Sequence, residues 1–204
     1  VSLERDFSDP LSCKGYVLTE MVRNAVSMIA DGLRSDSGRR AWRITGDYGS
    51  GKSSFGVFLA QLFSASRDDL PKSLRNAGRW KSRGIDPPMM LPVLVTGSRE
   101  AIGPAIARGV ASAVRGTYPK QPTSQAYAKL FALADGSAAY TDKDLLECIT
   151  ASRDELVRQK KASGILLIID ELGKFLEYEM LNPSGQDLYL LQLIAEQASR
   201  SGQY

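Results

Sequence analysis

The chain carries, at residues 46–53, the stretch Gly46-Asp47-Tyr48-Gly49-Ser50-Gly51-Lys52-Ser53. This stretch fits the phosphate-loop pattern G-x-x-x-x-G-K-[ST]. Its glycines allow the backbone to wrap around a phosphate in conformations that side chains would forbid. Successive N–H groups then form a nest for an anion, and the helix that begins at Lys52 adds the positive end of its dipole. We therefore predict that the loop binds the phosphates of a nucleotide.

The positions of the loop have different expected roles. The residues expected to contact the nucleotide are Gly46, Asp47, Tyr48, Gly49, Ser50, Gly51, Lys52, Ser53 and Ser54. The Lys52 ammonium is expected to reach the β- and γ-phosphates and to take part in catalysis, and the Ser53 hydroxyl is expected to bind Mg²⁺. The alternative interpretation of the stretch is a glycine-rich hairpin or a surface turn.

The segments around the loop favour the phosphate-binding interpretation. Residues 40–45 are predicted to form a strand, with Trp42 and Ile44 on one side. An amphipathic helix is predicted to begin near Lys52, because apolar residues recur at helical spacing. Those residues are Phe55, Phe58, Leu59 and Leu62. A strand before the motif and a helix after it are the context that the motif requires.

A second motif follows an apolar segment, in the stretch Leu167-Ile168-Ile169-Asp170-Glu171. An apolar strand carries Asp170 to the carboxyl edge of a parallel sheet, where α/β proteins bind ligands. We expect Asp170 to bind Mg²⁺, mostly through water, and Glu171 to act as the general base on the water that attacks the γ-phosphate. The alternative is a pair of solvated acids at a strand end.

The remaining pattern alternates helices with strands. Helices are predicted over 19–33, over the segment that follows Pro104, over 126–134 and after a capping box formed by Thr141 and Asp144. Residues 91–96 are predicted to form an edge strand because of Pro92, and residues 165–169 a strand buried on both faces. A last helix is predicted to end near residue 200. This alternation indicates an α/β fold with a mostly parallel sheet.

Composition excludes several classes of protein. Of the 204 residues, 43% are hydrophobic and 24% are charged, as in globular proteins. The absence of histidine excludes Ser-His-Asp catalysis and histidine metal sites, and the two distant cysteines, Cys13 and Cys148, suit a reducing cytoplasm. The longest aliphatic run, 165–169, is too short to cross a membrane, and the N-terminus has no signal-peptide pattern. A net charge of +3 does not by itself indicate nucleic acid.

The two motifs together, GDYGSGKSSF and LLIIDELGKFLE, resemble the P-loop ATPases that carry a catalytic glutamate beside the magnesium aspartate. The resemblance is to AAA+ proteins of the origin-recognition-like branch, and it extends to ATPases of bacterial phage-defence (bacteriophage-exclusion) systems. It implies a three-layer α/β P-loop fold, and Mg²⁺-dependent ATP hydrolysis coupled to a conformational or assembly step on DNA. It also implies an oligomer, or partner subunits that supply an arginine finger.

The same resemblance implies the strand order 5-1-4-3-2. Only the first three strands have candidate segments in the chain, so we expect an N-terminal part of a longer ATPase that is incomplete at its C-terminus. The fourth and fifth strands, the sensor, the arginine finger and the helical lid would lie beyond Tyr204. On this interpretation residues 1–39 form an N-terminal arm, irregular to about residue 15, and a helix, and residues 40–204 form the ATPase core.

Two alternative functions remain open. Asp170-Glu171-Leu172-Gly173 also matches the D-x-x-G pattern of GTPases, in which Gly173 would sense the γ-phosphate. Glu171 in the second position favours an ATPase. The guanine-reading N-K-x-D is absent from these residues, but it could lie beyond Tyr204, so its absence does not decide between the two. The other alternative is a nucleotide-gated scaffold or signalling switch with little turnover.

Three further features have candidate roles. Thr96 lies at the end of the second strand, where AAA+-like proteins can hold the catalytic glutamate with a polar residue; the alternative is a satisfied strand-end hydroxyl. Residues 72–83 contain five basic side chains and Trp80, which suit either nucleic acid, through phosphate contacts and stacking, or a solvated loop. Tyr16 and Leu18 are candidates for the adenine pocket.

Overall fold

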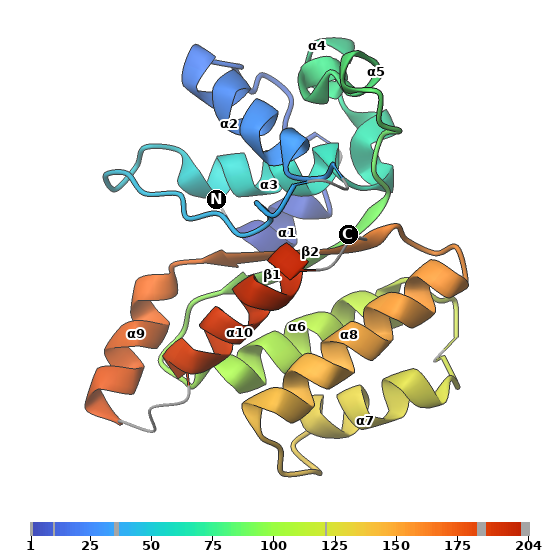
Figure 1. Cartoon of the computed structure of the whole chain (residues 1–204). Coiled ribbons are helices and arrows are strands. Elements are labelled where there is room, and N and C mark those ends of the chain that lie inside the picture. The colour runs from blue at the N-terminus through green and yellow to red at the C-terminus, as the bar shows by residue number, and fades with distance from the viewer. Residues whose placement is uncertain (1, 10, 35–36, 121, 183–186, 201–204) are drawn as a thin grey trace.

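Figure 1 shows the computed structural model of the chain, which describes residues 2–9, 11–34, 37–120, 122–182 and 187–200. At its centre lie two parallel strands, β1 (Met90–Thr96) and β2 (Gly164–Asp170). Met90 lies opposite Gly164, and Thr96 lies opposite Asp170. The prediction of an α/β chain with a parallel sheet is therefore confirmed.

Helices lie on both sides of this sheet (Figure 1). The helices on one side are α1 (Leu3–Phe7), α2 (Glu20–Asp31), α3 (Lys52–Leu62), α4 (Lys72–Arg75) and α5 (Trp80–Arg83), with short 3-10 turns at Ala65–Asp69 and Asn76–Gly78. The helices on the other side are α6 (Ile102–Gly116), α7 (Gln125–Ala134), α8 (Asp142–Arg158) and α10 (Asp187–Arg200). Helix α9 (Leu172–Leu181) follows the carboxyl end of β2.

The alternation of side chains along the strands divides the core into two clusters. Even-numbered residues, among them Leu94 and Ile168, pack with α1, α2 and α3. Odd-numbered residues, among them Val93 and Val95, pack with α6, α7 and α8. This division follows from the two-residue period of a strand, in which neighbouring side chains point to opposite faces.

Pro92 lies on the outer side of β1, away from β2. The Met89 C=O accepts from the Ser163 N–H at 2.8 Å, and the Gly97 N–H donates to the Asp170 C=O at 2.9 Å, so the odd-numbered backbone groups face β2. The Met90 N–H instead donates to the Phe63 C=O at 2.8 Å. Pro92 shares the parity of Met90, so its missing N–H interrupts no hydrogen bond to β2.

The predicted strand at residues 40–45 is not formed, which corrects the sequence analysis. The segment has no strand pairing, and Trp42 and Ile44 remain 38% and 47% exposed. A strand needs a neighbour for its backbone hydrogen bonds. The described residues provide none at this place, although the apolar alternation is present.

Two other expectations need correction. Residues 165–170 are only half-buried, because β2 pairs on one side alone within the described part of the chain. The first residues are not an irregular arm: α1 is a helix, and its Leu3 is 1% exposed. A Cβ built on Gly56 would lie 3.0 Å from the Leu3 side chain, so α1 packs directly on α3.

The local signals in the sequence are confirmed elsewhere. Helix α2 begins after Thr19, whose hydroxyl accepts from the Val22 N–H at 3.2 Å. Helix α8 begins with the capping box of Thr141 and Asp144, and α3 begins at Lys52. The predicted helix at 126–134 corresponds to α7. None of the helices in the described ranges combines the length and the apolar character that crossing a bilayer would require.

Candidate functional site

The predicted phosphate loop is an exposed turn that leads into α3. Gly49 and Gly51 have φ angles of 78° and 85°, in the left-handed region that other residues rarely adopt. Gly51 is the N-terminal cap of α3. A Cβ built on Gly46 would lie 3.0 Å from the Ser50 Oγ, so the two ends of the turn are close. Glycine is therefore used where the backbone bends most sharply.

The Lys52 side chain folds back and binds the backbone at the start of this turn. Its ammonium donates to the Gly46 C=O at 2.8 Å and to the Asp47 C=O at 2.7 Å, and it lies 3.4 Å from the Ser50 Oγ. These partners are carbonyl and hydroxyl oxygens, so the positive charge is not neutralised by a carboxylate there. The ammonium can exchange them for the oxygens of an anion at the mouth of the turn.

The other predicted loop residues lie around this lysine. The Tyr48 side chain is fully exposed, and Asp47 and Ser50 are also exposed. Ser53 and Ser54 are half-buried in the first turn of α3. The first turn of a helix attracts anions, because its backbone N–H groups have no partner within the helix.

Packing brings the start of α3 toward the end of β2. A Cβ built on Gly56 would lie 3.5 Å from the Ile168 side chain, so the helix and the strand touch there. Lys52 lies one helical turn, about 6 Å, before Gly56. Asp170 lies two residues, about 7 Å, after Ile168. Figure 1 shows the start of α3 and the carboxyl end of β2 at the same side of the molecule.

Asp170 belongs to the face of the sheet that α3 covers. It has the parity of Leu166 and Ile168, which pack in the cluster with α3. Its Oδ1 accepts from the Glu171 N–H at 2.9 Å. Among the described residues it forms no ion pair with a lysine or an arginine. Its carboxylate is therefore available to a cation.

Glu171 has an unusual backbone. Its φ of 50° is one of the few positive values outside glycine, and it is the N-terminal cap of α9. Its side chain accepts from Lys174, one turn later in α9. A Cβ built on Gly97 would lie 2.1 Å from the Glu171 carbonyl oxygen, so only glycine fits there. The bend after β2 is thus fitted against the end of β1.

The oxygen donors of Asp170 and Ser53 are of the types that bind Mg²⁺. In the described part of the chain no three Cys, Asp or Glu side chains gather as a metal cluster, and the sequence has no histidine. Mg²⁺ commonly binds through one or two carboxylates, waters and phosphate oxygens rather than in an all-protein cage. Asp170 and the Ser53 hydroxyl provide a donor set of that kind.

Thr96 has a different partner from the one considered in the sequence analysis. Its hydroxyl donates to Glu4, at 3.1 Å from Oε1 and 2.9 Å from Oε2, whereas Glu171 is paired with Lys174. Thr96 and Asp170 are opposite each other in the strand register, on the face toward α3. Thr96 therefore does not hold Glu171 in this structure.

Trp80 does not stack on nucleic acid. It is 6% exposed and packs edge to face on Phe63, with ring centroids 5.2 Å apart. Arg83 donates to the Asp31 carboxylate at 2.8 Å, and Arg75 donates to backbone carbonyls. The exposed basic residues of the segment are Lys72, Arg79 and Lys81. The Trp80 ring therefore belongs to the core, although its neighbours in sequence are basic.

Tyr16 and Leu18, the candidates for an adenine pocket, pack in the core. The Tyr16 ring stacks on Phe58 with centroids 4.9 Å apart, and burial raises the pKa of Tyr16 to about 12. Leu18 is partly buried in the same cluster. The structure thus gives both residues a packing role.

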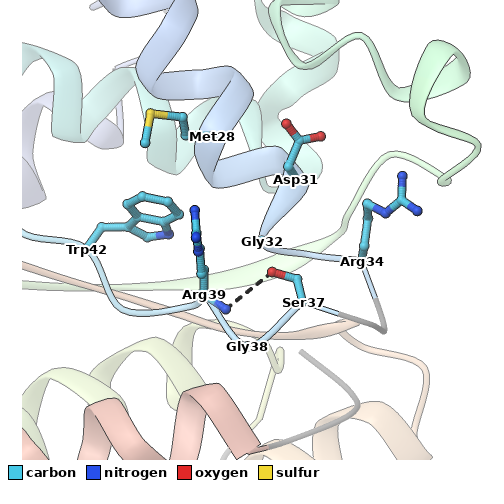
Figure 2. Close-up of a pocket in the computed structure, with 8 residues that line it drawn as sticks. All are labelled: Met28, Asp31, Gly32, Arg34, Ser37, Gly38, Arg39 and Trp42. Atoms are coloured by element: carbon cyan, nitrogen blue, oxygen red, sulfur yellow. Dashed lines mark hydrogen bonds between the residues drawn. The ribbon is translucent and has the colours of Figure 1, made fainter.

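A separate pocket of about 420 Å³ lies near the C-terminal end of α2 (Figure 2). Met28, Trp42 and Arg39 are among the residues that line it, and the Arg39 N–H donates to the Ser37 hydroxyl at 3.2 Å. It contains none of the predicted phosphate or magnesium residues. The predicted site therefore lies outside this pocket.

Sequence reasoning missed two residues near the site, Glu4 and Gly97. Gly97 directly follows β1, and a glycine at a strand end is a recognisable sign of a close backbone approach. Glu4 lies 92 positions from Thr96 and has no local pattern that points to the site.

Comparison of the chain with protein-family models, with curated proteins and with solved structures gives no match. A function must therefore be inferred from the side chains themselves.

Proposed function

We propose that the protein is a Mg²⁺-dependent ATPase of the P-loop class that couples hydrolysis of the β–γ bond to a conformational or assembly step on DNA. The observation that carries this proposal is the Lys52 ammonium, held 2.7–2.8 Å from the carbonyls of a glycine turn at the start of α3. The same helix packs on the strand that ends in Asp170. A P-loop nucleotide site requires both of these parts, so their presence supports the proposal.

Each residue would then have a defined role. The loop N–H groups and Lys52 would hold the phosphates, while Ser53 and Asp170 would hold Mg²⁺, which neutralises charge that develops on the phosphates. Glu171 would accept the proton of the attacking water. Its exposed pair with Lys174 is inexpensive to open, since such pairs stabilise by about 0–1 kcal/mol.

The strand arrangement supports a three-layer P-loop fold. The strands labelled β1 and β2 correspond to the second and third strands of the order 5-1-4-3-2. In that order the second and third strands are neighbours, and β1 and β2 are indeed paired in parallel. The same order leaves the first strand without either of them as a neighbour, which agrees with the unpaired segment at 40–45. Helix α10 ends beside the start of that segment, since a Cβ built on Gly38 would lie 4.0 Å from the Ser199 carbonyl oxygen.

Binding and turnover by the whole chain test this proposal. ATP affinity and phosphate release are measured with Mg²⁺, with EDTA, and with and without double-stranded DNA. We expect Mg²⁺-dependent binding, and hydrolysis where an oligomer or partner subunits supply the arginine finger. Absence of Mg²⁺-dependent binding of both ATP and GTP would contradict the proposal.

The second candidate function is a nucleotide-gated switch, and the D-x-x-G match at Asp170 to Gly173 is the observation that favours it. Tight nucleotide binding without turnover, with or without DNA, would favour a scaffold or switch. A strong preference for GTP would favour a GTPase-like protein.

The partners and the location form part of the same proposal. An ATPase of this kind would assemble as an oligomer, or with partner subunits, that supply an arginine finger. The exposed Lys72, Arg79 and Lys81 are the candidates for DNA phosphate contacts, whose affinity would fall with salt. Cys13 and Cys148 are both buried and free, which suits the cytoplasm.

A further inference from the structure

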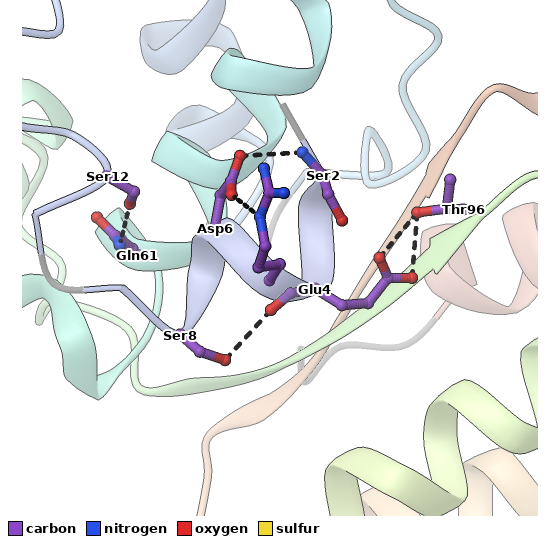
Figure 3. A network of polar contacts seen from close by, with 8 residues as sticks. Ser2, Glu4, Asp6, Ser8, Ser12, Gln61 and Thr96 are labelled. Carbon is purple, nitrogen blue, oxygen red and sulfur yellow. Dashed lines mark hydrogen bonds and ion pairs between the residues drawn. The ribbon is translucent and has the colours of Figure 1, made fainter.

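Helix α1 reaches the acidic end of the sheet through Glu4. The Thr96 hydroxyl donates to both Glu4 carboxylate oxygens (Figure 3). The helix is fixed in this position because Leu3, next to Glu4, is buried against α3. A segment distant in sequence thus contributes a carboxylate beside the strand end that carries Asp170.

The contact determines what the Thr96 hydroxyl can do. A hydroxyl has a single proton to donate and two lone pairs that accept. The Glu4 carboxylate accepts the hydrogen bond from this proton. Thr96 therefore cannot donate to the Asp170 carboxylate, which lies opposite it in the register. The Thr96 oxygen remains an acceptor, which suits a donor such as a water molecule bound to a cation.

We propose that Glu4 is a positioning residue for the magnesium site of Asp170 and Ser53, an inference that rests on the proposed function. Because Glu4 accepts the hydrogen bond from the Thr96 hydroxyl, the Asp170 carboxylate stays available to the cation. It also leaves Thr96 as an acceptor for a water molecule of the ion's hydration shell. Without Glu4, the Thr96 hydroxyl turns toward Asp170 and competes with the cation for its oxygens.

This mechanism predicts an unusual order of variants. Glu4→Ala weakens the Mg²⁺-dependent part of ATP binding by about tenfold, the effect of one charge-assisted hydrogen bond. Thr96→Val removes the competing donor and costs about threefold or less, because a single weak water contact is lost. The double variant Glu4→Ala/Thr96→Val therefore binds better than Glu4→Ala alone. Thr96→Ser keeps the hydroxyl and behaves like the parent.

Asp6→Ala is the matched control on the same helix. The Asp6 carboxylate accepts from the Ser2 N–H at 2.9 Å and pairs with Arg5, and it has no bond to Thr96. The variant therefore disturbs α1 without touching the Thr96 hydroxyl. We expect it to leave the Mg²⁺ dependence of binding unchanged.

The readout is the ratio of the dissociation constants of a fluorescent ATP analogue in Mg²⁺ and in EDTA, with circular dichroism melts as a folding check. Suppression of the Glu4→Ala defect by Thr96→Val supports the inference. An unchanged ratio in Glu4→Ala, additive losses in the double variant, or an equal loss in Asp6→Ala overturns it and leaves the proposed function intact. A parent protein without Mg²⁺-dependent binding overturns both.

Discussion

The phosphate loop and the acidic end of β2 are held in place in different ways. The loop is exposed, and its shape depends on its own atoms, chiefly the bonds from Lys52 to Gly46 and Asp47. Asp170 and Glu171 are tied instead to the neighbouring strand through the backbone of Gly97. A ligand can therefore reshape the loop by replacing the partners of Lys52, whereas the acidic end offers a fixed edge.

The largest expected effect tests the chemistry of the fixed edge. Glu171→Gln preserves size and hydrogen bonding but cannot accept a proton from water, so ATP turnover falls by about 10²–10⁴-fold. ATP binding is expected to survive, because Lys52, Ser53 and Asp170 are unchanged. Steady-state phosphate release and nucleotide affinity are measured together. Glu177→Gln, an exposed change in the helix that Glu171 caps, is the control. Parental turnover in Glu171→Gln would leave the GTPase-like interpretation, with Gly173 as the γ-phosphate sensor, as the better account.

The next effect tests the loop. Lys52→Ala removes the ammonium that would contact the phosphates, and ATP affinity is expected to fall by about 100-fold. The fold is expected to persist, because the partners of Lys52 are exposed loop oxygens. Lys143→Ala, at an exposed position in α8 on the other side of the sheet, serves as the control. Unchanged affinity in a folded Lys52→Ala protein would remove the phosphate-loop assignment.

A stability measurement tests the claim that the acidic end is fixed by the neighbouring strand. Gly97→Ala places a methyl group against the Glu171 carbonyl and is expected to destabilise the protein by about 1–3 kcal/mol. Gly116→Ala, where the built Cβ meets nothing within 4 Å, is the matched control. Urea denaturation of the three proteins provides the comparison. Equal stability of both variants would show that the two strand ends are not tightly fitted.

The smallest expected effect separates the two functions. A Cβ built on Gly173 meets nothing within 4 Å, and the residue lies within α9. Gly173→Ala is therefore expected to stabilise the helix by about 0.5–1 kcal/mol and to leave ATP turnover unchanged. If Gly173 senses the γ-phosphate, as the D-x-x-G interpretation requires, the same change instead abolishes nucleotide turnover. Thermal melts and turnover are measured on one preparation.

Local signals were sufficient to predict much of the fold. Thr141 caps the helix that it was expected to cap, the helix predicted over 19–33 is formed over Glu20–Asp31, and the helix of the phosphate loop begins at Lys52. These features depend on hydrogen bonds between residues close in sequence. The roles assigned to Lys52, Asp170 and Glu171 remain predictions, although the structure brings the segments that carry them to one end of the sheet.

The failures share a physical cause, namely dependence on distant partners. Residues 40–45 have a strand-like pattern but no neighbour to pair with in the described chain. Trp80 lies among basic residues, yet its ring is buried against Phe63, which no local pattern indicates. The Thr96 hydroxyl is bound by Glu4 rather than by a residue near it in sequence. Composition and periodicity predict the local structure of a segment, but they do not show which distant residues pack against it.

Pro92 makes the two margins of the sheet unequal. On the outer side of β1 the Pro92 position has no proton to offer, and the Met90 N–H is already engaged by Phe63. A further strand added there would find its ladder interrupted at two successive positions. On β2 the outward residues, such as Leu167, retain their N–H groups. Within the described residues, the outer margin of β1 is therefore less suited to accept another strand than the outer margin of β2.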